Sequence, residues 1–361
     1  MNSADSFSAD YAQARGKFRE AAAEAGGALE AMTHPERGPD GGELAADVAW
    51  FGPRDAPAVL VMISGTHGAE GFCGSGAQVD WLRRGGAAGL PAGVAVLIIH
   101  AINPYGFAWL RRVTHENVDL NRNWIDFGGQ PPGNAGYDQL ADAICPADWT
   151  PEAQVASFQV LGAFIAKNGM MAMQQAVSGG QYNHPKGVFY GGAGPTWSRR
   201  TQTAIFDHYL KGAGRIGIVD YHTGLGPWGY GEQIITDRVG SPGYDRARRW
   251  YGGAVTSPSS GTSTSADIVG DGLAAAPVLL AHAEVTGMAL EVGTQETMSV
   301  LNALRADAWL HAHGDPLSDE GRAIKTLVRD AFYGDADDWK GMVAGQSLSA
   351  TRKAVAGLAR G

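Results

Sequence analysis

The sequence predicts an α/β fold, namely a single three-layer α/β/α domain around a mixed, mostly parallel, twisted sheet. Three observations favour it. Apolar runs of strand length alternate with segments of helical length in the first half of the chain and again towards its end. The strongest run, VAVLIIH at 94–100, is apolar at almost every position, as in strands that are buried on both faces. Glycine-rich loops follow such runs, and ligands of open α/β sheets bind beyond strand ends.

The elements follow one another along the chain in an order that suits such a sheet. Apolar residues at roughly helical spacing, with charges between them, predict an amphipathic helix over 8–32. Pro151 opens a long predicted helix over 151–177. Gly85 and Gly86 end a short helix. The predicted strands lie at 47–53, 56–65, 93–100, 216–221, 232–237 and 287–294, and further helices at 74–86, 296–314, 318–334 and 338–360.

Length and composition bound the function. The chain of 361 residues is expected to form one domain over 1–361, with an irregular and helical insertion at about 125–215 and a C-terminal helical segment at about 296–361. The net charge of −9 with scattered Lys and Arg disfavours nucleic acid and membrane surfaces as partners. Two cysteines form no disulfide framework, and the first residues lack a secretory signal, so a cytoplasmic protein is expected. Homo-oligomer formation stays open.

The first chemical motif is GTHGAEG, where His67 and Glu70 follow a buried strand. Zinc accepts this H-x-x-E ligand mixture, and the glycines are expected to allow close approach to a ligand. His222, in DYHTG, ends a second apolar strand and is the best candidate for a third ligand. His100 also ends a strand, but a hydrogen-bonded core histidine is the simpler interpretation.

Five segments occur in the order expected of the zinc carboxypeptidase family of carboxypeptidase A: GTHGAEG, INPYGFAW, RRVTHENVDLNRNW, DYHTG and ALEVG. The chain resembles a little-characterised bacterial branch related to the aspartoacylase and succinylglutamate desuccinylase amidohydrolases. The likeness spans about residues 55–295, and NVDLNRNW is its most specific element. It implies a zinc-carboxypeptidase-like fold and one Zn²⁺ per chain, held by the metal ligands His67, Glu70 and His222.

The resemblance also assigns the remaining site residues. Asn121 and Arg122 match the pair that binds a substrate carboxylate, a task that suits a planar guanidinium. Arg112 matches the arginine that polarises the scissile carbonyl, although Arg111 could exchange with it. Glu291 matches the general base, and a carboxylate that ends so apolar a run is costly unless it is neutral, paired or near a metal. Its polar alternatives are Glu284 and Glu296.

These assignments predict a zinc-dependent hydrolase that cleaves an amide bond in a carboxypeptidase-like way, in a peptide or small N-acylated substrate with a free carboxylate. Carboxypeptidases carry a mobile tyrosine in the loop before the catalytic glutamate, whereas TSPSSGTSTSADI at 256–268 has none. This departure keeps open a small-molecule deacylase of aspartoacylase type. A non-catalytic protein that binds metal or ligand is the remaining alternative, which a retained Glu291 disfavours.

Other chemistries fit the sequence less well. Ser75 lies in GFCGSG, where Cys73 replaces the first glycine of a nucleophile elbow. The same segment lacks the terminal G-K-[ST] of a phosphate-binding loop. Cys73 itself is expected to be a small buried residue rather than a nucleophile.

Overall fold

The computed structural model describes residues 2–360. A seven-stranded sheet lies at its centre, with strand order β1-β2-β4-β3-β5-β7-β6. The four inner strands β4, β3, β5 and β7 are parallel, and β1, β2 and β6 join antiparallel at the two sides. The strands are β1 (Ala28–Arg37), β2 (Glu43–Phe51), β3 (Ala58–Ile63), β4 (Val94–His100), β5 (Arg215–Thr223), β6 (Gly231–Ile234) and β7 (Glu284–Val292).

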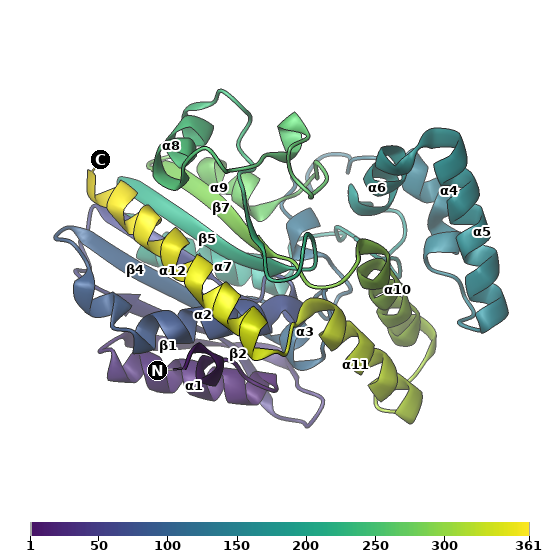
Figure 1. Ribbon diagram of the computed structural model, residues 1–361, viewed down its shortest axis with the longest axis horizontal. Coiled ribbons are helices and arrows are strands. Elements are labelled where there is room, and N and C mark those ends of the chain that lie inside the picture. The colour runs from purple at the N-terminus through teal and green to yellow at the C-terminus, as the bar shows by residue number, and fades with distance from the viewer. Residues whose placement is uncertain (1, 361) are drawn as a thin grey trace.

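Helices cover both faces of the sheet, which confirms the predicted mixed, mostly parallel α/β fold (Figure 1). One face packs against α1, α2, α8 and α12, and the other against α7 and α9. The covering helices are α1 (Tyr11–Glu24), α2 (Gly71–Arg83), α7 (Trp197–Tyr209), α8 (Pro242–Tyr251), α9 (Gly272–Leu279) and α12 (Asp337–Arg360). The parallel strands are buried along their length because both faces are covered.

A helical lobe stands at one end of the molecule and has its own hydrophobic cluster (Figure 1). It consists of α4 (Ala135–Ile144), α5 (Pro151–Asn168), α6 (Met170–Ser178), α10 (Thr297–His313) and α11 (Asp319–Phe332). Within the 125–215 stretch that was expected to be an insertion, α4, α5 and α6 belong to this lobe, whereas α7 packs on the sheet. A short helix, α3 (Pro104–Ala108), and the 3-10 turns η2 (Gly68–Glu70) and η4 (Leu120–Arg122) lie beside the strand ends.

Two predicted helices were wrong in their extent. The helix expected over 8–32 ends at Glu24, and β1 begins four residues later. Gly26 has φ +76°, and a Cβ at Gly27 would come within 2.7 Å of the Phe51 ring, so this turn needs glycine. The helix expected over 151–177 is divided into α5 and α6 at Gly169, whose φ is +88°.

Within residues 2–360, no helix has both the length and the apolar composition needed to cross a membrane. Both cysteines are free, and Cys73 is fully buried in the core, where burial raises the pKa of its thiol well above the ordinary value. His100 is a core histidine as expected, since its Nε2 lies 2.8 Å from the Ser75 hydroxyl and its ring stacks on Phe18.

Candidate active site

The turn after β3 holds His67 directly before the 3-10 turn η2 and Glu70 at its last position. The chain there packs directly against the segment that contains α3. A Cβ at Gly68 would lie 1.9 Å from the backbone of Gly106, and the Gly68 N–H donates to the Arg112 carbonyl at 3.1 Å. The expectation that these glycines clear space for a ligand was therefore wrong for Gly68, which instead lets two backbones meet.

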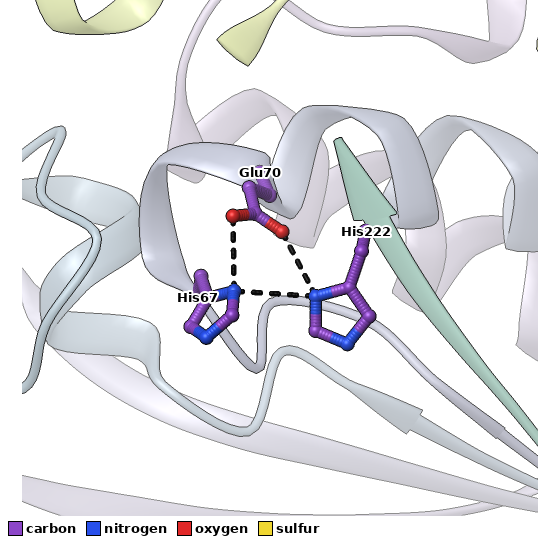
Figure 2. Close-up of side chains that lie close together, drawn as sticks. All are labelled: His67, Glu70 and His222. Carbon is purple, nitrogen blue, oxygen red and sulfur yellow. Dashed lines mark hydrogen bonds and ion pairs between the residues drawn. The ribbon is translucent and has the colours of Figure 1, made fainter. Parts of the chain in front are cut away.

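His222 reaches the same point from β5, the neighbouring parallel strand (Figure 2). Glu70 lies between the two imidazoles, with one carboxylate oxygen 2.9 Å from His67 Nδ1 and the other 3.0 Å from His222 Nδ1. The two Nδ1 atoms are 3.2 Å apart. All three side chains are buried. The structure thus brings together the three residues that the sequence proposed as metal ligands, although they are separated by up to 155 positions.

The far side of each imidazole is held by a buried carboxylate. His67 Nε2 lies 3.2 Å from Asp119 Oδ1, and His222 Nε2 lies 3.0 Å from Asp220 Oδ2. The Thr66 hydroxyl donates to Asp220 at 2.8 Å and so fixes that carboxylate. Metal-binding histidines commonly donate their second N–H to such a carboxylate, which sets the tautomer and the ring orientation. Both Nδ1 atoms are thereby directed at Glu70.

This donor set fits a divalent ion such as zinc. Two ligand atoms that each lie about 2.0–2.1 Å from a tetrahedral zinc ion are about 3.3 Å apart, close to the observed Nδ1 separation. Burial by itself would raise the pKa of Glu70, but His67, His222 and Arg112 together lower it well below its ordinary value. Burial opposes the charged form of His222, yet Asp220 and Glu70 raise its pKa well above the usual range. His222 therefore lies in a strongly negative environment.

Of the two candidate arginines, Arg112 lies at this cluster and Arg111 does not. Arg112 Nη1 donates to Glu70 at 2.9 Å and its Nε donates to Asp119 at 2.9 Å. Arg111 points towards α10, where its Nε donates to Asp307 at 3.1 Å. Of the two side chains, only that of Arg112 lines the cavity described below.

Asn121 and Arg122 lie in the 3-10 turn η4, and both side chains are buried. The Arg122 Nε donates to the Ser178 carbonyl at 3.1 Å, and its guanidinium lies over the Phe189 ring at 5.3 Å. Asn121 accepts a hydrogen bond from the Gly272 N–H at 3.2 Å. Both side chains line the same cavity as Arg112.

Glu291 lies near the end of β7, in parallel register with His222 on β5. One of its oxygens accepts a hydrogen bond from the Leu225 N–H at 3.0 Å. Burial, and then the nearby carboxylate of Glu70, raise the pKa of Glu291 to about 8. Glu284 and Glu296, the other two candidates for the general base, are both exposed, whereas Glu291 is buried.

A cavity of about 950 Å³ connects these groups. Its polar part contains His67, Arg112, Asn121, Arg122, His222 and Glu291. The lobe helices α6 and α10 and the serine-rich loop at 257–266 complete the wall. The loop and α6 are joined directly, since the Gln174 amide donates to the Thr264 carbonyl at 3.0 Å. No tyrosine lines the cavity within the described part of the chain, in agreement with the departure noted in the sequence.

The sequence interpretation missed the two supporting carboxylates. A signal for Asp220 was present, because residues two apart on a strand share a face and Asp220 precedes His222 by two. Asp119 lies within the NVDLNRNW motif but was given no role. Asp119 joins both arginines of the cavity to His67, with Arg122 Nη1 at 3.8 Å.

Comparison with solved structures returns the two hydrolase groups that the motifs resemble. Bovine thrombin-activatable fibrinolysis inhibitor, solved in complex with tick carboxypeptidase inhibitor, is 12% identical with a TM-score of 0.46, over 98% of this chain and 97% of that one. Carboxypeptidase A from Helicoverpa armigera is 12% identical with a TM-score of 0.45, over 96% and 74%. The succinylglutamate desuccinylase of Chromobacterium violaceum is 13% identical with a TM-score of 0.37, over 84% and 74%.

No curated protein sequence matches the chain significantly. A family model described as "Protein of unknown function (DUF2817)" matches residues 7–346. Because this match covers nearly the whole sequence, the chain belongs to the DUF2817 family.

Proposed function

We propose that the protein is a zinc-dependent hydrolase that cleaves an amide bond in a substrate with a free carboxylate. One observation carries the proposal: the Nδ1 atoms of His67 and His222 converge on Glu70 in a cavity that also holds the buried carboxylate of Glu291. A buried acid beside a three-ligand site is the arrangement that metal-assisted hydrolysis needs. A protein that only binds metal has no need of the acid.

His67, Glu70 and His222 would hold the ion, which when bound supplies Lewis acidity and lowers the pKa of nearby water. Glu291 takes a proton from the attacking water and passes it to the amide nitrogen as the carbon–nitrogen bond breaks. The Leu225 N–H keeps this carboxylate in place. The Arg112 guanidinium donates to the carbonyl oxygen as negative charge develops there.

Asn121 and Arg122 would bind the free carboxylate of the substrate. Arg122 brings a guanidinium to the cavity, and burial lowers its pKa below the ordinary value while Asp119 acts in the opposite direction. The Asn121 amide nitrogen makes no hydrogen bond within residues 2–360, which leaves it available to an oxygen of the substrate. The two groups offer a charge and a donor at neighbouring positions.

The test combines one substitution with metal analysis. Glu291→Gln keeps the size of the side chain but removes the base, so we expect about one zinc per chain and a loss of hydrolysis of at least about 10²-fold. Glu284→Gln, at the exposed start of β7 and outside the cavity lining, is the matched control and should leave the rate unchanged. Undiminished turnover by the Glu291→Gln protein would refute the mechanism, and a purified protein unable to bind zinc would refute the metal site.

A small-molecule deacylase is the second candidate, because the cavity wall lacks the tyrosine expected of a carboxypeptidase. Peptides with free C-termini and N-acyl amino acids separate the two. Strict dependence on an α-carboxylate next to the scissile amide of a peptide favours the carboxypeptidase. Hydrolysis of N-acyl amino acids without hydrolysis of peptides favours the deacylase.

A further inference from the structure

The cavity has a second part, which the proposed mechanism does not use. Five apolar side chains of α6 and α10 line this second part, which we call the apolar compartment. They are Met170, Met173, Val177, Leu301 and Leu304. Both helices stand in the lobe at one end of the molecule (Figure 1). Neither α6 nor α10 contributes a charged side chain to the cavity wall. The apolar compartment therefore contrasts with the polar part, where the arginines, histidines and Glu291 lie.

The apolar compartment is built into the fold. Met173, Val177 and Leu304 belong to the hydrophobic cluster of the lobe, and each is almost fully buried. The lobe core thus continues into the cavity wall. Methionine adapts its shape to different apolar partners because it is unbranched and flexible. Met170 remains 57% exposed beside the cavity, so an apolar ligand there would cover surface that is now in water.

The size of the cavity sets the scale of the ligand. At about 30 Å³ per non-hydrogen atom, the share of a water molecule in the liquid, 950 Å³ holds about thirty such atoms. An N-acetyl amino acid, with about ten non-hydrogen atoms, would leave much of this space empty. A chain of about sixteen or more carbons, attached through the amide to an amino acid, brings the total above about twenty atoms, so it would occupy most of the cavity, including the apolar compartment.

We propose that the substrate is an N-acyl amino acid with a long aliphatic acyl chain, which lies between α6 and α10 while the amino acid carboxylate lies at Asn121 and Arg122. This inference rests on the proposed function. Water adds its hydroxyl to the acyl carbon, the carbon–nitrogen bond breaks, and the nitrogen takes the proton through Glu291. The products are one fatty acid and one amino acid, with no other reactant consumed.

The binding of N-acyl glycines to an inactive variant tests the proposed acyl-chain site without turnover. The zinc-loaded Glu291→Gln protein is titrated with N-acyl glycines of two, four, eight and twelve acyl carbons. Because each buried methylene contributes about 0.8 kcal/mol, we expect the affinity to rise by up to about fourfold per methylene until the compartment is full. Equal affinity for the acetyl and dodecanoyl compounds would overturn the inference.

Two neighbouring methionines supply the matched variants. Met170 lines the cavity, whereas Met171 is 81% exposed and does not. Met170→Asp places a charge beside the acyl chain, so we expect it to weaken dodecanoyl glycine about tenfold or more and to leave acetyl glycine unchanged. Met171→Asp should change neither. Equal effects of both substitutions would mean that the chain binds outside the cavity, and would overturn the assignment.

The wild-type enzyme separates this inference from the proposed function. Faster hydrolysis of dodecanoyl than of acetyl compounds, measured as kcat/KM below the micelle concentration, supports both. Hydrolysis of acetyl compounds alone, or of peptides alone, leaves the proposed function standing and overturns the inference. Absence of any amide hydrolysis by the zinc-loaded enzyme would overturn the proposed function first.

Discussion

Two adjacent arginines point into two different buried charge clusters. Arg112 belongs to the site cluster, which comprises His67, Glu70, Arg112, Asp119, Asp220 and His222. Arg111 belongs to what we call the anchor cluster, which lies between α10 and α11 and comprises Arg111, Asp307, His311 and Lys325. Both clusters are buried, but they differ in the balance of charge.

Carboxylates outnumber cationic side chains in and beside the site cluster. Glu70, Asp119 and Asp220 are joined there by Glu291, while the permanent positive charges are those of Arg112 and Arg122. In the anchor cluster one carboxylate, Asp307, meets both Arg111 and Lys325. Because buried charge is costly unless it is compensated, this excess is offset either by protons, as the raised pKa values of His222 and Glu291 indicate, or by a bound cation. In the anchor cluster the two cations outnumber the carboxylate, and its ion pairs join Arg111 to α10 and α10 to α11.

The largest expected effect concerns Asp307, the only carboxylate of the anchor cluster. Arg111 and Lys325 hold its pKa down to about 2 although burial acts in the opposite direction. Asp307→Asn leaves two buried cations without a counter-charge, so we expect a loss of about 3–5 kcal/mol in the free energy of unfolding. Urea denaturation measures it.

Asp330→Asn is the control for that substitution, since its carboxylate is half exposed and a surface pair contributes at most about 1 kcal/mol. Zinc stoichiometry of the folded Asp307→Asn protein should stay at about one per chain. If the Asp307→Asn protein lost its metal but kept its stability, the anchor cluster would support the metal site rather than the fold. The distinction between the two clusters would then be wrong.

The second prediction compares how substitutions of Arg112 and Arg111 change the activity. Arg112→Gln removes the donor that faces the cavity, and we expect kcat/KM to fall by about 10²–10³-fold, as for removal of an oxyanion donor. Arg111→Gln should destabilise the fold and leave kcat/KM of the folded, zinc-loaded enzyme within a few-fold of wild type. Equal losses of activity in two folded, metal-loaded variants would refute the assignment of Arg112.

The same contrast shows what local sequence can specify. Apolar runs identified β3, β4, β5 and β7, because strands covered on both faces are apolar throughout. The residues at the ends of β3 and β5 then supplied His67, Glu70 and His222. The strand β1 was missed, since it is a mostly exposed side strand paired only with β2 and interrupted by an irregularity after Thr33. Its sequence, ALEAMTHPER, therefore contains no continuous apolar run that would predict a strand.

Other contacts between distant segments could not be predicted from the sequence. The motif alone left Arg111 and Arg112 open, because the choice depends on how α10 packs beside the turn that precedes η4. The approach of α6 to the serine-rich loop depends on the placement of the whole lobe. Such pairs are set by tertiary packing, which periodicity does not encode.

The smallest effect is a pH dependence that belongs to the anchor cluster alone. Burial and the charge of Arg111 lower the pKa of Lys325 to about 8, whereas the Asp307 carboxylate acts in the opposite direction. His311 on α10 also contacts the Lys325 ammonium. Between about pH 8 and 10.5 the unfolded chain holds a proton on this lysine that the folded chain lacks, so this group makes the protein more stable as pH rises, by at most about 1.4 kcal/mol per pH unit. Urea denaturation at pH 7.5, 8.5 and 9.5 should show this slope in wild type but not in Lys325→Met.

The zinc stoichiometry of the two proteins should be equal at every pH, because Lys325 contacts no residue of the site cluster among the described hydrogen bonds and ion pairs. An identical slope in both proteins would mean that Lys325 is not the group that titrates, and that the anchor cluster carries its charge at no cost.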